Sequence, residues 1–175
     1  MTNKSRICVI ATGLALLVAI PLSAAPKKPK APKLVPFKGK LTAVVTSEET
    51  VVENPDMTTT TTTEETLEGA GNGTHLGRFA LEGETTSSTD EAEAAGGTMI
   101  FTAANGDEVW ATVAGESVLG SDGLVDTAIE GTIVGGTGRF DTSTGYFTML
   151  ITTDPVTGAA KATYTGKISG PGKGN

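Results

Sequence analysis

The stretch TMIFTAANGDEVWATVAGESV, residues 98–118, decides the fold class. Its two halves, residues 98–103 and 108–118, are rich in β-branched and apolar side chains, which is typical of strands. Between them, Asn105 and Gly106 supply the positive φ that a tight hairpin turn requires. The stretch therefore predicts an antiparallel hairpin closed by a two-residue turn.

The same pattern of alternating strands and short turns extends in both directions from this hairpin. At residues 37–46, Phe37, Leu41 and Val45 alternate with polar residues, which indicates a strand with one buried face. Glycine-rich or proline-containing turns follow at residues 135–138 and 154–158. The predicted strands are residues 37–46, 58–67, 74–83 with a possible bulge at Gly77, 98–103, 108–118, 125–134, 145–153 and 159–169.

Eight consecutive antiparallel strands have two common solutions, a closed barrel and a β-sandwich. Glycines inside the predicted strands fit the tight bends of a small barrel; they are Gly39, Gly77, Gly115, Gly131 and Gly166. We therefore predict an all-β domain, an eight-stranded antiparallel β-barrel over residues 37–170, with a β-sandwich as the alternative. The interior of such a barrel is filled by side chains or holds one small ligand.

One segment has helical features. Residues 88–91 resemble a helix N-terminal capping box, an alanine-rich stretch follows, and Gly96 with Gly97 is a typical helix stop. The segment has no apolar stripe that would anchor a helix. A helix of two turns and a charged loop both remain open for residues 88–95.

The first residues have the pattern of a secretory signal peptide. Lys4 and Arg6 precede a 14-residue uncharged apolar run at residues 7–20, and small residues follow. The run is shorter than the ~20 residues of a membrane-spanning helix. We predict cleavage after Ala24, which removes Cys8, leaves no transmembrane span in the mature chain, and makes the protein secreted or periplasmic. An uncleaved N-terminal anchor is the alternative.

Charge is segregated along the chain. Residues 25–36 form a Lys- and Pro-rich linker, an extended tether. Lys27, Lys28, Lys30 and Lys33 of this linker suit an anionic surface polymer or membrane surface, or act only as a solubilising spacer. Residues 41–160 instead hold all 20 acidic residues of this Thr-rich chain and only two cations, which disfavours nucleic acid as a partner. Residues 171–175 are predicted to form a flexible tail.

Several short motifs resemble those of a known group of proteins. GNGTHLGRF at residues 71–79 and GGTGRF at residues 135–140 are similar to motifs of secreted bacterial proteins of unassigned function. The second motif also resembles a corner of the allene-oxide-cyclase and dirigent barrel superfamily. Residues 102–107 and 164–169 fit the same order, so the resemblance covers residues 37–169. It implies a β-barrel of that type, and no site residue is carried over from it.

His75 is the one side chain with an ordinary pKa near neutrality. A catalytic interpretation pairs it with a carboxylate, either Glu82, Asp107 or Asp141. A structural interpretation places it at a strand end, where it bonds a neighbouring backbone group.

Arg78 and Arg139 each occupy a Gly-Arg-Phe triplet. With His75 they are the candidate ligand-binding residues, because a guanidinium offers several donors in a fixed plane and suits an anion. The structural alternative is that each arginine bonds a carboxylate or a turn while Phe79 and Phe140 close the barrel ends. Gly138, Asn105 and Gly106 are predicted to be structural turn residues.

The sequence does not favour a metal or cofactor site. One histidine and one cysteine cannot form a His/Cys metal cage. Residues 105–108 lack the regular acidic spacing of a calcium loop, and residues 135–138 lack the Lys-Ser/Thr pair of a phosphate loop. We predict no metal, no cofactor and no catalytic residues.

These observations favour a secreted non-catalytic β-barrel module of unknown ligand, with a binding or structural role; a small apolar ligand and an anionic surface polymer are the partners considered. The alternative is a cyclase- or isomerase-type enzyme that acts on a small apolar substrate in the barrel mouth; it rests on analogy of fold alone. The volume and lining of the barrel interior distinguish these functions.

Overall fold

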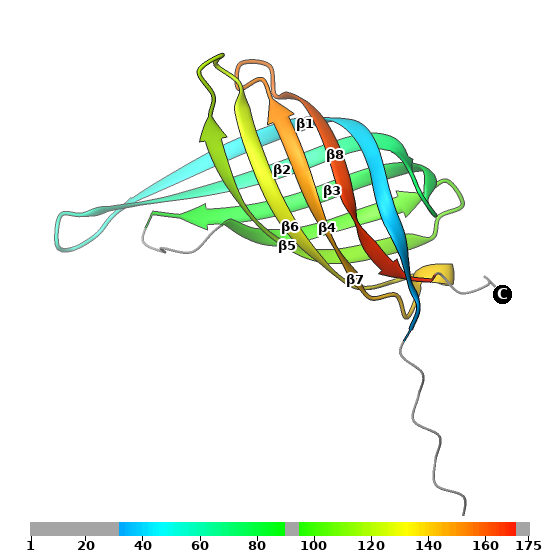
Figure 1. Cartoon of the computed structure of the whole chain (residues 1–175). Helices are drawn as coiled ribbons and strands as arrows, with labels where there is room; N and C mark the ends of the chain where they lie inside the picture. Colours follow the sequence, from blue (N-terminus) through cyan, green and yellow to red (C-terminus); the bar gives the residue numbers. More distant parts are fainter. Residues whose placement is uncertain (1–31, 90–94, 171–175) are drawn as a thin grey trace, which may run out of the picture. The chain divides into compact units, whose positions relative to one another are not determined.

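The computed structural model describes residues 32–89 and 95–170 and confirms the all-β prediction (Figure 1). Eight strands follow one another, and one short 3₁₀ helix, η1 (Gly138–Phe140), precedes the seventh. The strands are β1 (Leu34–Glu53), β2 (Thr59–Gly73), β3 (Gly77–Ser88), β4 (Ala95–Ala103), β5 (Glu108–Leu119), β6 (Val125–Gly136), β7 (Gly145–Thr153) and β8 (Ala159–Ser169). No helix in the described part of the chain is long and apolar enough to cross a membrane.

The strands form a closed antiparallel barrel in the order β1 to β8. Each strand pairs with the next in sequence, and the sheet closes where β1 pairs with β8. In that closing ladder, Leu34 lies opposite Ser169 and Val44 lies opposite Ala159. The closed sheet is the barrel predicted from the turn and strand pattern, and the β-sandwich alternative is wrong.

Side chains alternate between the interior and the outer surface along every strand. On β1, Phe37, Leu41 and Ala43 are buried inside the barrel, whereas Lys38 and Lys40 are exposed. The described interior is almost entirely apolar. The hydrophobic effect therefore acts on one continuous core.

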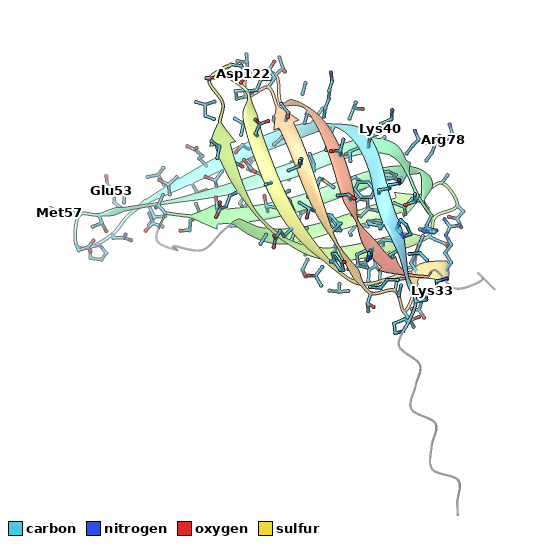
Figure 2. The ribbon with its side chains drawn as sticks, viewed as in Figure 1. Lys33, Lys40, Glu53, Met57, Arg78 and Asp122 are labelled. Atoms are coloured by element: carbon cyan, nitrogen blue, oxygen red, sulfur yellow. The ribbon has the colours of Figure 1, made fainter. Side chains whose placement is uncertain are left out.

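The β1–β2 hairpin is longer than predicted. β1 begins three residues earlier than expected, inside the predicted linker, and continues to Glu53. β2 continues to Gly73 rather than ending at residue 67. At the tip of the hairpin, the extended strands pair Glu53 with Thr59. Few side chains of this extension are buried, and its sequence accordingly shows little alternation of apolar and polar residues. Figure 2 shows Glu53 and Met57 at this hairpin tip.

The turn after β4 differs from the predicted two-residue turn. Ala103 N–H donates to the Asp107 carbonyl at 2.8 Å, and Gly106 N–H donates to the Ala103 carbonyl at 2.8 Å. Three residues therefore form the loop, and only Gly106 has positive φ, at 85°. A three-residue hairpin loop has the left-handed conformation at its last residue, which here is Gly106. Asn105 is the middle residue of the loop and therefore does not need that conformation.

Two further boundaries correct the sequence interpretation. Gly77 begins β3 with φ 66° and is a turn residue rather than a bulge inside a strand. Ser88 ends β3 and Ala95 begins β4. The first and last residues of the segment 88–95, for which a helix and a loop remained open, are therefore strand residues. Gly96 and Gly97 belong to β4 and do not stop a helix. The predicted helix or loop at residues 90–94 lies outside the described residues, as do the predicted signal peptide, most of the linker and the predicted tail.

Candidate functional site

Aromatic rings fill the half of the barrel nearest the start of β1. Phe37, Phe79, Phe101, Phe147 and Tyr164 are all almost fully buried, and their ring centroids lie 4.9–6.2 Å apart. Most pairs are tilted or edge-to-face, the geometry that aromatic quadrupoles favour. We call this half the closed end, because it leaves no room for a ligand among the rings.

Glycines on neighbouring strands make space for these rings. A Cβ atom at Gly131 would overlap the ring of Phe147, and one at Gly39 or Gly73 would overlap Tyr164. The interior glycines therefore complement large rings across the barrel, which accommodates five aromatic side chains in a narrow interior.

Tyr164 places a polar group inside the closed end. Its side chain is 2% exposed, and its hydroxyl has no hydrogen-bond partner among the described residues. Burial raises the pKa of Tyr164, because desolvation disfavours the phenolate. The hydroxyl is therefore neutral and is enclosed beside Gly39 and Gly73.

The opposite half of the barrel contains a cavity of about 570 Å³. Its inner wall is apolar and includes Leu67, Met99, Val113, Ile129 and Ile151, all buried. Nearer the opening, hydroxyl groups replace the aliphatic side chains. They belong to Ser47, Thr85, Ser117, Thr127 and Thr153. This volume lies in the ~300–1,000 Å³ range of small-molecule sites.

Aliphatic side chains are exposed around this opening, which we call the open end. Val51 and Val52 project from the β1–β2 hairpin, and Val118 and Leu119 lie at the end of β5. Val156, which lines the cavity from the β7–β8 loop, is 91% exposed. An apolar molecule approaching this end meets aliphatic surface before it reaches the cavity.

Glu65 is the one charged residue among the described residues that line the cavity. Its side chain is half-buried, and no ion pair to it is found in residues 32–89 and 95–170. Ser117 and Thr127 hydrogen-bond to each other at 2.8 Å. The lining therefore offers hydroxyl groups and one carboxylate, without a described histidine, lysine or arginine.

Arg139 lies at the closed end, far along the strands from the cavity, and connects three loops. Its guanidinium donates to the His75 carbonyl at 2.9 Å in the β2–β3 turn. Its Nε lies 3.6 Å from Asp107 Oδ2 in the β4–β5 loop. The same guanidinium lies 4.9 Å from the ring centroid of Phe140, which is fully buried. This arrangement links the three loops, as the structural interpretation of Arg139 predicts.

Gly138 accounts for the close approach of these loops. It has φ 55°, and a Cβ atom there would overlap the carboxylate of Asp107. Asn105 adds a hydrogen bond to Asp107 Oδ2 at 2.8 Å. The predicted turn residues Gly138 and Asn105 thus lie against one carboxylate, that of Asp107, while Gly106 supplies the positive φ of the β4–β5 loop.

Arg78 does not repeat the arrangement of Arg139, contrary to what the shared Gly-Arg-Phe triplet predicts. Phe79 points into the aromatic core, so the alternation of β3 places Arg78 on the exposed outer face. No hydrogen bond or ion pair of its side chain is found in the described parts of the chain. The two triplets differ because one opens a strand and the other forms a 3₁₀ turn.

His75 lies in the β2–β3 turn with φ 65°, and its side chain is exposed. Its backbone carbonyl, not its ring, receives the bond from Arg139. No bond from the ring to Glu82, Asp107 or Asp141 is found among the described residues. The structure therefore does not assemble the catalytic pair considered from the sequence, and the three candidate ligand-binding residues do not share a pocket.

Replacing Arg139 by alanine is expected to lower the free energy of unfolding by about 1–2 kcal/mol. The variant loses a charge-assisted hydrogen bond, a partly exposed ion pair and a ring contact. Arg78→Ala is the matched control and is expected to change stability by less than about 0.5 kcal/mol, because its side chain is exposed. Urea unfolding of both variants measures this difference. Equal losses in the two variants would contradict the role assigned to Arg139.

Sequence reasoning missed the residues that line the cavity. No local pattern in the sequence marks the serines and threonines at the open end as lining residues. Their inward positions become evident once the register of the barrel is known. Within the described ranges, no group of three or more histidine, cysteine, aspartate or glutamate residues could hold a metal ion.

Comparison with known proteins gives little further information. No protein-family model matches the chain, and no curated protein matches it. Among solved structures, the chain is similar to a pterocarpan synthase dirigent protein, with a TM-score of 0.41 and 21% sequence identity over 82% of this chain and 88% of that one. The eight-stranded barrel therefore rests on the strand pairing of this chain itself.

Proposed function

We propose that this protein is a non-catalytic binding module that holds a small, uncharged apolar molecule in the open end of its barrel. The observation that carries the proposal is the cavity of about 570 Å³, whose inner wall is aliphatic and whose opening is lined by hydroxyl groups. Apolar pockets with a few polar groups are typical of small-molecule sites.

The lining favours binding over catalysis. General acid–base chemistry needs a positioned proton donor and acceptor. The described lining offers one carboxylate, Glu65, while His75 and Arg139 lie at the other end of the barrel. The hydroxyl groups suit hydrogen bonds to one polar end of an otherwise apolar ligand. These features support a binding role rather than that of a cyclase or isomerase.

The charge of the open end selects against anions. Glu65 lines the cavity, and Glu48, Glu49, Glu53 and Glu64 are exposed on the adjoining β1–β2 hairpin. An anionic ligand would be repelled by this field, whereas a neutral ligand would not. We further propose that the module acts outside the cytoplasm, because the apolar run at residues 7–20 has the pattern of an export signal.

Binding of two fluorescent probes tests the proposal. N-phenyl-1-naphthylamine is neutral, and 1-anilinonaphthalene-8-sulfonate has a similar ring system with a negative charge. The neutral probe is expected to bind with a Kd of about 1–10 μM, about −7 to −8 kcal/mol, which is typical of an apolar pocket of this size. The anionic probe is expected to bind at least about tenfold more weakly, as one unfavourable charge interaction implies.

Two threonine variants on one strand locate the binding. Thr85 faces the cavity, and its neighbour Thr86 is exposed on the outer surface. Thr85→Phe fills the cavity and is expected to abolish the fluorescence increase, while Thr86→Phe leaves it unchanged. If both variants bind the neutral probe equally, or if the wild-type protein does not bind it, the proposed function is wrong.

A further inference from the structure

Closure of the barrel assembles a basic face that is not continuous in the sequence. β7 and β8 contain no acidic residue, and β1 contains none before Glu48. These three adjacent strands carry Lys38, Lys40, Lys161 and Lys167, all exposed on the outer surface. Of the other strands, β4 carries neither acids nor cations, whereas β2, β3, β5 and β6 carry acidic residues, as at Glu68, Glu82 and Glu130.

The register places two of these lysines diagonally across the closing ladder. Lys40 lies opposite Thr163, and Lys161 lies opposite Thr42. Each lysine is therefore displaced by two residues from the cross-strand partner of the other, on the same face of the sheet. Residues from the two ends of the barrel sequence thus create one local concentration of positive charge.

A groove of about 610 Å³ lies at this position on the outer surface. One row across the strands contains Asn72, Lys40, Thr163 and Leu150, and the next contains Ala70, Thr42, Lys161 and Thr152. The small side chains of Ala70 and Thr42 line the groove beside the two lysines. The groove therefore runs across β2, β1, β8 and β7.

Arg78 extends the first row by one strand. Asn72 lies opposite Lys40 on one side and opposite Arg78 on the other. With ~4.8 Å between neighbouring strands, Arg78 and Lys40 lie about 10 Å apart. Figure 2 shows Arg78 and Lys40 projecting from the same side of the barrel. The guanidinium of Arg78, which has no ion pair among the described residues, therefore lies near a second cation, Lys40.

We propose that this face binds an extended anionic polysaccharide along the groove from Arg78 to Lys161. Arg78, Lys40 and Lys161 follow one another across β3, β1 and β8, as an elongated polyanion requires. Between them the hydroxyl groups of Thr42 and Thr163 and the amide of Asn72 offer donors and acceptors that sugar hydroxyls can match, whereas the Thr152 hydroxyl already donates to Asp126 Oδ1 at 2.8 Å. Cation contacts release counterions from a polyanion, so binding weakens as salt increases.

A concave, hydroxyl-lined groove fits a polymer chain better than a lipid surface. Residues that bind a membrane surface present protruding apolar side chains next to the cations. Among the residues that line this groove, Leu150 is the one large aliphatic residue that is exposed, with a relative exposure of 59%.

The test is binding of fluorescently labelled polygalacturonate oligomers to the protein as recovered from its expressing cell, with its N-terminus determined. The double variant Lys40→Gln/Lys161→Gln is expected to bind about tenfold or more weakly at low salt and to show a shallower salt dependence. Thr112→Glu/Val134→Glu changes the net charge by the same amount on exposed positions of β5 and β6, and is expected to bind almost as the wild type does.

Three results would overturn the proposal. The first is equal weakening in the two double variants, which would indicate a response to net charge alone. The second is loss of binding when Lys27, Lys28 and Lys30 are changed to glutamine while Lys40→Gln/Lys161→Gln binds normally. The third is binding to vesicles of phosphatidylglycerol without binding to polygalacturonate. Neutral-probe binding in the cavity is measured on the same samples and is expected to be unchanged, so failure here is distinct from failure of the proposed function.

Discussion

Phe101→Ala is expected to lower the free energy of unfolding by about 3–5 kcal/mol, the typical cost of truncating a buried phenylalanine. Phe101 is fully buried, and its ring contacts all four other rings of the closed end at centroid distances of 5.4–5.7 Å. Removing it leaves a void that the surrounding strands of a closed barrel cannot collapse to fill. Chemical denaturation with urea measures the loss.

Tyr146→Ala is the matched control for this truncation. It also removes an aromatic ring from a strand, but Tyr146 is 53% exposed on the outer face of β7. Its truncation is expected to cost about 1 kcal/mol or less. Similar losses in the two variants would show that the aromatic cluster does not dominate the stability of the barrel.

Gly131→Val is expected to destabilise the barrel by about 3 kcal/mol, at the upper end of the usual cost of overpacking. The new Cβ atom would overlap the outer edge of the Phe147 ring. Thr132→Val, on the exposed face of the same strand, is the control and is expected to change stability by less than about 0.5 kcal/mol.

A double variant separates steric overlap from loss of backbone freedom. Phe147→Leu makes room beside residue 131, so the combination with Gly131→Val is expected to cost less than the sum of the two single changes, by about 1 kcal/mol or more. Strict additivity would mean that the cost arises from the glycine backbone itself, and the complementarity of glycine and ring would be wrong.

The fold was predictable because alternation and turn chemistry are local properties. Every predicted strand corresponds to an observed one. Apolar residues at alternate positions, such as Phe37 and Leu41, mark the buried face of a strand in the sequence itself. The boundaries of the β1–β2 hairpin were not predictable, because its tip pairs threonines with glutamates, valines and another threonine, and none of these side chains is fully buried. The turn at Asn105 and Gly106 was placed correctly, and its length was wrong, because the same residues suit loops of two and three residues.

The candidate site was much less predictable. The cavity arises where inward positions change from rings to aliphatic and small hydroxyl side chains, and its lining is distributed over seven strands and the β7–β8 loop. The Gly-Arg-Phe triplets suggested that Arg78 and Arg139 are equivalent, but the alternation of β3 separates them. Lys40 and Lys161 become neighbours only through the closing ladder. No local pattern contains that contact.

The closing ladder also determines the order in which this barrel can fold. Seven of its eight strand pairings join neighbours in sequence and form by local hairpin closure. The β1–β8 pairing brings together the two ends of the domain, so it bears most of the loop-closure entropy and is expected to be the slow step. Until β8 is available, β1 has an unpaired edge that could pair with another chain. Lys38 and Lys40 on that edge discourage such pairing, because lysines on an open edge repel a second copy.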